Sequence, residues 1–470
     1  MQKQKNLGAE YCLLGIKFGF LQPGTNIFGM RHSHIVHTFL LLTALMTVSC
    51  VKDPLETPRF PDTIDNVLII YSAGQNSLAS YLKEDIRDFC KGYLPAGNDP
   101  NILLSYQKIS SKYTPAPSYL IRYYSYMGRL AADTLLRFPA DMKASSAGTL
   151  NEVLAYARDN FPSKGYGLLF SSHATGWLPK GYYSDPDHYD DMYGSSTAHV
   201  TAGRTQAEPG IDGSVPYIQP ERDPSAPPVK SLGEDRIWGN GQALSYQMEL
   251  SEFDDAIPMH LDYIFFDCCL MGGIEVAYEL RDKCNMILFS PAEVIAEGFD
   301  YTKMGKRLLG KNGPDLKGVC SDYYEYYSTH PKGGQYRSAT VTLVDCMRLE
   351  PVADACRTIF NNCRQGLADI VPDEVQQYYT GNCHWFYDLY DIAVKAGTDD
   401  TALAELQDAI EGCIIYKAHT DSFLLDNGYG SGFDIRTYSG FSMYLPCNGS
   451  PYLDDSYRRL EWNMATGLIM

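Results

Sequence analysis

Short apolar runs alternate with amphipathic stretches along the chain. The runs are rich in β-branched and aromatic residues and lack polar alternation, which is typical of strands buried on both faces. They lie at residues 67–71, 102–106, 119–124, 166–170, 263–266, 286–290 and 340–344. Between them, apolar residues recur with helical spacing, as at 78–89, where Ser77 is placed to cap the helix, and at 150–161. Strands that alternate with helices predict an α/β fold with a parallel sheet covered on both faces.

Two of these strands end in residues that can do chemistry. The run 263–266 leads into Cys268 and Cys269, and the run 166–170 leads into His173. The carboxyl ends of parallel strands lie at one edge of a sheet, where such folds bind ligands. Because a free thiol is mostly protonated at neutral pH, a catalytic cysteine needs a neighbouring imidazole. We therefore expect His173 and Cys269 to meet at this edge, the alternatives being a buried core cysteine and a structural histidine.

The sequences around both residues resemble a known family. SSHATGW at 171–177 and FFDCCLMGGIEVAYEL at 265–280 resemble the histidine and cysteine motifs of the clostripain family of cysteine peptidases, which have a caspase-like fold. Residues 65–89, 290–301 and 438–446 resemble further parts of that family. The resemblance implies an α/β fold: a caspase-like α/β/α sandwich with a mostly parallel central sheet and a C-terminal extension.

The resemblance covers most of residues 65–470. Residues 65–345 are expected to form the peptidase core. Residues 346–470 are expected to complete the same α/β structure, with a helical run at 403–417 and a strand at 441–445.

The resemblance also implies roles for the candidate residues. The family's cysteine motif usually reads Asp-Ala-Cys-Leu-Met, which assigns the nucleophile to Cys269 and places Cys268 at the alanine position. Cys269 would form an acyl-enzyme, while His173 takes the thiol proton and then protonates the leaving amine. The oxyanion hole would consist of the N–H groups of Cys269 and Ala174. The family more often has glycine at the position of Ala174, so alanine would be strained if the loop needs a positive φ.

Specificity is expected to rest on Asp267. In the family, the acidic residue two positions before the nucleophile lies in the pocket for the side chain that precedes the cleaved bond. A carboxylate there would pair with Arg, and next with Lys, through charge-assisted hydrogen bonds. The alternative is that Asp267 caps the following turn. Glu293 or Glu297 is the candidate for a second acid in the substrate-binding pocket.

The N-terminal region has the pattern of an export signal. Residues 30–50 comprise a short charged region, an apolar core too short to span a bilayer, and small residues before Cys50. This resembles a lipoprotein signal with lipidation at Cys50; Thr47 stands where leucine is common, so a plain secretory signal is the alternative. Residues 1–29 are interpreted as an extension upstream of the true start or as a buried amphipathic segment, and residues 51–64 as a linker. We expect a membrane-anchored lipoprotein, periplasmic or on the surface of a Gram-negative bacterium.

Residues 178–235 are polar, rich in glycine and proline, and predict an exposed or partly disordered loop. The resemblance implies maturation within this region, the alternative being a tolerated surface insertion. The candidate self-cleavage points are Lys180, Arg204, Arg222, Lys230 and Arg236. Acidic residues in the loop offer hard oxygen ligands for calcium, although they lack EF-hand spacing. These are Asp185, Asp187, Asp190 and Asp191.

The amino-acid composition limits which kinds of partner and cofactor are expected. The formal net charge of −18 argues against a nucleic-acid partner and favours cationic ligands. The 13 cysteines lack the CxxC spacing of a zinc site and mostly sit singly, so we expect buried free thiols. No cofactor is expected apart from the calcium hypothesis. The expected partners are peptides or proteins containing Arg or Lys, and the chain is expected to be a monomer.

Three functions are compatible with these patterns. The first is an exported cysteine endopeptidase. The second is a non-catalytic lipoprotein of the same fold that binds peptides or glycans, which Ala174 favours and the intact His173 and Cys269 oppose. The third is a thiol-redox protein that uses Cys268 and Cys269, which is disfavoured because adjacent cysteines form strained disulfides.

Overall fold

The computed structural model describes residues 61, 63–194, 217–218, 232–239, 242–379, 383–425 and 432–470. The predictions for residues 1–29, for the signal at 30–50 with Cys50, and for most of the linker at 51–64 therefore lie outside the described residues. So do three of the candidate cleavage points, Arg204, Arg222 and Lys230.

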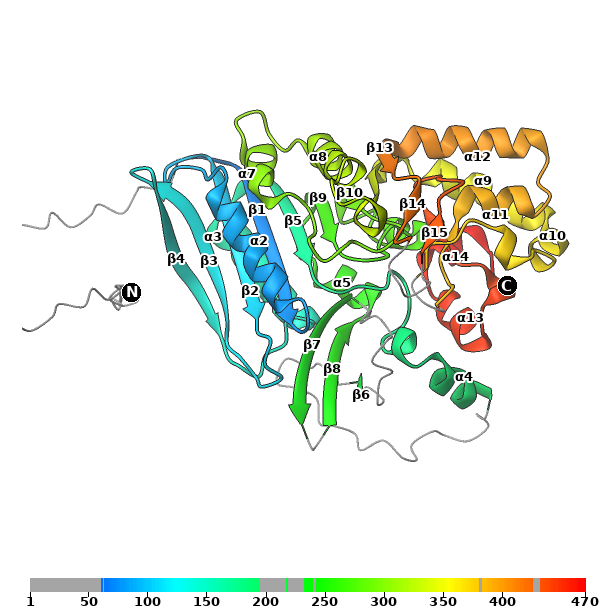
Figure 1. The fold of residues 1–470 in the computed structure, drawn as a ribbon, viewed down its shortest axis with the longest axis horizontal. Coiled ribbons are helices and arrows are strands. Elements are labelled where there is room, and N and C mark those ends of the chain that lie inside the picture. The colour runs from blue at the N-terminus through cyan, green and yellow to red at the C-terminus, as the bar shows by residue number, and fades with distance from the viewer. Residues whose placement is uncertain are drawn as a thin grey trace, which may run out of the picture. The chain divides into compact units, whose positions relative to one another are not determined.

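A sheet that comprises 12 strands over the described residues forms the centre of the fold, with the main order β13-β11-β10-β9-β5-β1-β2-β3-β4 (Figure 1). Its five central strands are parallel to one another. They are β10 (Cys284–Phe289), β9 (Leu261–Asp267), β5 (Ser163–Ser171), β1 (Ile64–Gln75) and β2 (Asn101–Ile109). Antiparallel strands extend both edges. They are β11 (Thr340–Asp345) and β13 (Ile414–His419) at one edge, and β3 (Ser118–Tyr126) and β4 (Arg129–Phe138) at the other.

Helices cover both faces of this sheet because successive side chains of a buried strand point in opposite directions. In β1, Val67 and Ile69 join one hydrophobic core, whereas Leu68 and Ile70 join the other. The core of Leu68 includes residues of α2 (Ala79–Lys91), α7 (Tyr301–Leu309) and α8 (Leu316–Ser328). The core of Val67 includes residues of α3 (Ala147–Asn160), α5 (Leu250–Ala256), α6 (Ile274–Glu279) and α9 (Glu350–Asn362). The predicted α/β/α sandwich with a mostly parallel sheet is confirmed.

Three local predictions differ from the structure. The apolar pattern missed β4, which is an exposed edge strand and therefore lacks a buried run. The helical run predicted at 403–417 ends with α12 (Asp400–Cys413), and the β-branched residues that follow pair with β11 as β13. The strand predicted at 441–445 is reduced to β16 (Ser442–Met443).

Ordered elements also occur within residues 178–235, where a loop was predicted. Tyr182 and Tyr183 are buried in a short 3₁₀ turn, η1 (Tyr182–Ser184), followed by α4 (Pro186–Gly194). Tyr182 stacks on Tyr452 with ring centroids 5.5 Å apart, a tertiary contact that a polar sequence average does not reveal. The hairpin of β7 (Leu232–Gly239) and β8 (Gln242–Met248) then begins inside the predicted loop, and β6 (Tyr217–Ile218) pairs with β8.

Apart from β13, whose Tyr416 and Ala418 pack against the core of Leu68, the elements beyond β11 contribute to the same core as α3 and α6. The further elements of this part of the chain are η3 (Cys346–Arg348), α10 (Arg364–Ala368), β12 (Tyr387–Asp388), α11 (Leu389–Lys395), β14 (Ser422–Phe423), β15 (Phe433–Asp434), α13 (Pro451–Tyr457) and α14 (Glu461–Thr466). None of the helices in the described part of the chain combines the length and apolarity needed to cross a membrane.

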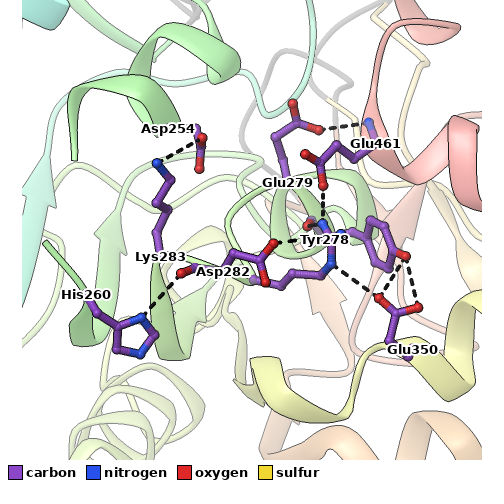
Figure 2. Close-up of polar contacts among 9 residues, drawn as sticks. Asp254, His260, Tyr278, Glu279, Asp282, Lys283, Glu350 and Glu461 are labelled. Carbon is purple, nitrogen blue, oxygen red and sulfur yellow. Dashed lines mark hydrogen bonds and ion pairs between the residues drawn. The ribbon is translucent and has the colours of Figure 1, made fainter. Parts of the chain in front are cut away.

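Polar contacts fasten α6 to the C-terminal helices (Figure 2). Arg281, just beyond α6, donates to the carbonyl of Tyr278 at 2.6 Å and pairs with Glu350 at 3.3 Å and with Glu461. The Tyr278 hydroxyl donates to Glu350 at 3.0 Å, and the N–H of Glu461 donates to Glu279 at 3.0 Å. Glu350 and Glu461 begin α9 and α14, so both helices hold the helix that follows the candidate nucleophile.

Candidate active site

The register of the central sheet brings the two candidate catalytic segments together. Ser171 at the end of β5 pairs with Asp267 at the end of β9. His173 and Cys269 each lie two residues beyond this pair, so they leave the sheet side by side at its carboxyl edge. Both line one cavity of about 280 Å³. The structure therefore places the predicted dyad residues around a common cavity.

The two adjacent cysteines have different surroundings. The Cys268 thiol is buried and donates to the carbonyl of Phe170 at 3.3 Å. The Cys269 sulfur lies at the cavity, accepts from the N–H of Val294 at 3.4 Å and donates to its carbonyl at 3.6 Å. Both thiols are free. This geometry favours Cys269 over Cys268 as nucleophile and disfavours a redox pair.

The turn that presents Cys269 is strained. Leu270, which follows it, has a φ of 59°, a left-handed conformation that costs a branched residue about 1–2 kcal/mol. The Leu270 N–H donates to the carbonyl of Ala292 at 2.9 Å, and its side chain is buried. The surrounding contacts therefore hold the turn in place, a pattern common where a reactive side chain must be presented.

The Cys269 thiol is protonated in this resting arrangement. Burial raises its pKa far above the ordinary value, and the neighbouring carboxylate of Glu293 raises it further. A buried thiolate beside a carboxylate is unfavourable in a medium of low polarity. Attack by the sulfur consequently requires a base to remove the proton as the bond to the substrate forms.

His173 and the neighbouring Ser172 are held by contacts from two segments, the loop before α2 and the start of β7. The Nε2 of His173 lies 2.9 Å from Oγ of Ser77, so Ser77 contacts the imidazole rather than capping α2, whose N-cap is Leu78. The backbone carbonyl of His173 accepts from the N–H of Gly233 at 3.0 Å, at the start of β7. The N–H of Glu234 donates to Ser172 at 3.3 Å. These contacts could not be predicted from local sequence patterns, because Ser77 and β7 are distant from His173 along the chain.

The β7 segment is itself anchored by a buried acid. Asp235 accepts from the N–H of Ser145 at 2.7 Å and from its hydroxyl at 2.8 Å. Burial raises the pKa of Asp235, an effect that Lys108 and the Ser145 hydrogen bonds oppose. The hairpin that steadies the histidine loop is thus fastened to the segment before α3.

Ala174, the candidate oxyanion-hole residue, is free of backbone strain. Among the described residues, the non-glycine residues with positive φ are Met127, Leu270 and Leu424, so Ala174 does not need the freedom of glycine. Its side chain is fully buried. Trp177, further along the loop, packs against Tyr444 and Tyr457 with ring centroids 4.9 Å away from each. Alanine is therefore not strained at this position, and the oxyanion-hole role of Ala174 stays a prediction.

Asp267 lines the same cavity. Its carboxylate accepts from the Tyr301 hydroxyl at 2.6 Å and from the Ser171 hydroxyl at 3.4 Å. Both donors are side chains on other elements, and α6 begins at a different N-cap, Gly273. The arrangement therefore favours a pocket role over a capping role. Burial raises the pKa of Asp267 to about 6, so the group ionises within the physiological range.

The cavity is acidic. Asp85, Asp267 and Glu293 line it, whereas none of the described lining residues is a lysine or an arginine. Glu297 is exposed and lies outside the lining. Sequence reasoning missed Asp85, because an acid on the polar face of an amphipathic helix ordinarily points to solvent and gives no signal of its own.

The described residues contain no group of three or more His, Cys, Asp or Glu arranged to hold a metal ion. Of the acidic residues in the predicted loop, Asp190 accepts from the Tyr182 hydroxyl at 3.1 Å. Calcium binding by these acids stays a prediction.

Comparison with known proteins decides the family. The sequence model of the Clostripain family matches residues 70–197 and 229–462, which are more than half of the chain and include His173 and Cys269. The chain belongs to the Clostripain family. It is accordingly a cysteine peptidase, as the sequence motifs indicated. No curated protein sequence matches this clostripain-family peptidase.

Solved structures agree with this assignment. An inactive zymogen C11 protease from Parabacteroides distasonis is 25% identical, with a TM-score of 0.67 over 86% of this chain and 99% of that chain. A secreted C11 cysteine protease from Bacteroides thetaiotaomicron, in complex with an irreversible peptide inhibitor, is 19% identical, with a TM-score of 0.65 over 86% of this chain and 99% of that one. At 19% identity, the similarity to this second structure concerns the fold alone.

Proposed function

We propose that this clostripain-family peptidase is an exported endopeptidase that cleaves after Arg, and less efficiently after Lys, through His173 and Cys269. The observation that carries the proposal is the acidic cavity beside Cys269. A cationic side chain that entered it would lie near Asp267, and none of the described lining residues is a lysine or an arginine that would repel it. A guanidinium in such a pocket gains charge-assisted hydrogen bonds that a neutral or acidic side chain lacks.

In the proposed reaction, Cys269 attacks the carbonyl carbon while His173 accepts the thiol proton. The proton then passes to the leaving amine as the C–N bond breaks, leaving an acyl-enzyme. Water hydrolyses the thioester and regenerates the thiol. The N–H groups of Cys269 and Ala174 would donate to the oxyanion of each tetrahedral intermediate, each contributing roughly 3 kcal/mol to the barrier reduction.

Self-activation by cleavage within residues 178–236 belongs to the same proposal. Peptidases bind substrates as accessible, extended chain. Lys180 pairs with Glu252 at 2.8 Å, and Arg236 lies within the β7–β8 ladder opposite Ser245. These contacts disfavour Lys180 and Arg236 as cleavage points and leave Arg204, Arg222 and Lys230 as candidates.

Export is supported by the signal pattern of residues 30–50 and by the secreted C11 protease from Bacteroides thetaiotaomicron. Lipidation of Cys50 would then anchor the peptidase to a membrane. Mass spectrometry of the N-terminal peptide from membrane and medium fractions tests this part: a diacylglyceryl adduct on Cys50 supports it, and an unmodified N-terminus in the medium contradicts it.

The activity is tested with fluorogenic peptides that end in Arg, Lys or Asp. We expect Arg turnover by the full chain, weaker Lys turnover and none after Asp. Cys269→Ala should remove turnover, and His173→Ala should reduce it by about 10²- to 10⁴-fold. Cys268→Ala is the matched control and should retain activity. A folded chain that hydrolyses none of the peptides would contradict the proposal and favour a non-catalytic binding role.

A further inference from the structure

One carboxylate of the acidic cavity has no role in the reaction described above. Asp85 lies on α2, one turn after Tyr81, and lines the same cavity as Asp267. It forms no ion pair with any described residue. Burial, the carboxyl of Asp267 and that of Asp88 raise the pKa of Asp85 to about 9.

With its pKa raised to about 9, the Asp85 carboxyl is neutral at physiological pH in the free enzyme, and a cation beside it would favour its ionised form. A buried carboxylate costs free energy unless it is paired, and a second carboxylate nearby adds repulsion. Tyr301 does not neutralise the pair, because its hydroxyl donates to Asp267 and carries no charge. Such an arrangement is typical of a site whose missing partner is a cation.

We infer that Asp85 is a specificity-determining residue, the second carboxylate of the substrate pocket, and that it selects Arg over Lys by bridging the guanidinium together with Asp267. The inference rests on the proposed function and adds a second residue that determines its specificity. A guanidinium is planar and has N–H donors along more than one edge, so two carboxylates on different elements can each engage one edge. An ammonium is a compact point charge that Asp267 alone can satisfy.

The position of Asp85 fits this role. It comes from α2, whereas Asp267 comes from the end of β9, and Gly298, with φ 63°, also lines the cavity. A Cβ at Gly298 would lie 3.2 Å from the Asp267 carboxylate. The absence of a side chain at Gly298 therefore leaves the space beside the Asp267 carboxylate open.

The test compares kcat/KM for Arg and Lys peptides in the full chain and in Asp85→Asn. The variant should lower kcat/KM for Arg at least tenfold, chiefly through KM, and for Lys no more than about threefold. Asp88→Asn makes the same substitution one turn away, outside the cavity lining, and should change both values less than twofold. The rate at which iodoacetamide alkylates Cys269 should be unchanged in both variants, which reports an intact nucleophile.

The outcomes separate the two proposals. An unchanged Arg value in Asp85→Asn, or an equal loss for Arg and Lys, overturns the role of Asp85 while leaving the peptidase activity in place. A parent chain that cleaves neither peptide overturns both. If Asp85→Asn unfolds, Asp85→Glu provides the second test, since it keeps the charge and should retain Arg turnover that Asp85→Ala loses.

Discussion

At the residue scale, the account depends on how burial tunes individual groups. Burial raises the pKa values of both Cys269 and Asp267, with different expected effects on function. The raised pKa keeps the thiol inert until a base acts on it. The raised pKa of Asp267 places the charge that would bind substrate under the control of pH.

Asp267→Asn should therefore stabilise the protein while it impairs activity. The folded pKa of about 6 exceeds the usual unfolded value, so the native state binds more protons between roughly pH 4 and 6, and stability falls as pH rises through that window. An asparagine at this position does not ionise, so the variant should not lose this stability as the pH rises. The Tm of the variant should exceed that of the parent at pH 8 and match it near pH 4. A lower Tm at pH 8 contradicts the assignment.

The same pKa predicts the acid limb of activity. Asp267 becomes protonated and neutral as pH falls below about 6, so kcat/KM for Arg peptides should decline there. The groups that face this carboxyl are Asp85, Ser171 and Tyr301. Activity that is constant from pH 7 to pH 4.5 would contradict an ionised Asp267 as the binding group.

Ser77 is predicted to be a positioning residue. Its hydroxyl lies 2.9 Å from Nε2 of His173, so its loss should let the imidazole leave its position without removing a substrate contact. Ser77→Ala should lower kcat about tenfold with little change in KM and shift the pH at which the rate is half-maximal. Ser77→Thr should restore most of the rate. A change confined to KM, or no change, contradicts this role.

At the element scale, the strands that carry the site were predictable and their surroundings were not. His173, Cys269 and Asp267 could be identified from the buried runs that form β5 and β9 and from the residues that follow them. A buried strand that ends in polar residues is an unusual pattern. Asp85 and Ser77 carried no such signal, since their importance arises from packing of α2 against the sheet edge. The polar sequence of 178–235 concealed α4 and the start of β7, because their order depends on tertiary contacts.

The contacts in Figure 2 predict that the C-terminal helices support the nucleophile segment. Arg281→Ala removes the pairs with Glu350 and Glu461 and should lower the free energy of unfolding by about 2 kcal/mol. Arg459→Ala, which breaks an exposed pair with Asp455, should change it by less than about 0.5 kcal/mol. Chemical denaturation measures both, and equal effects would contradict the supporting role.

At the scale of the whole molecule, the chain is a clostripain-family peptidase in which a mostly parallel sheet brings the candidate nucleophile, the candidate base and the candidate pocket acid to one edge. The mostly parallel sheet and the family followed from local sequence patterns. The antiparallel edge strands and the clamp of β7 on the histidine loop did not, because they depend on residues far apart in the chain.

Self-processing provides a prediction at this scale. If the chain cleaves itself, N-terminal sequencing of the fragments should identify a cut after Arg204, Arg222 or Lys230. Fragments should be absent from Cys269→Ala. They should still form in Lys180→Ala and Arg236→Ala, because Lys180 is held in an ion pair and Arg236 in a strand ladder, so neither residue is expected to be the cleavage point. A dominant cut after Lys180 or Arg236 would contradict this.

The central claim is that Cys269 is the nucleophile of an arginine-directed peptidase. Its most direct test is to treat the full chain with an irreversible thiol-reactive peptide ending in Arg and to locate the adduct by mass spectrometry. We predict one adduct on Cys269, retained in Cys268→Ala, lost in Cys269→Ala and slowed in His173→Ala. An adduct on another cysteine, or equal labelling by a matched peptide ending in Asp, would contradict the account.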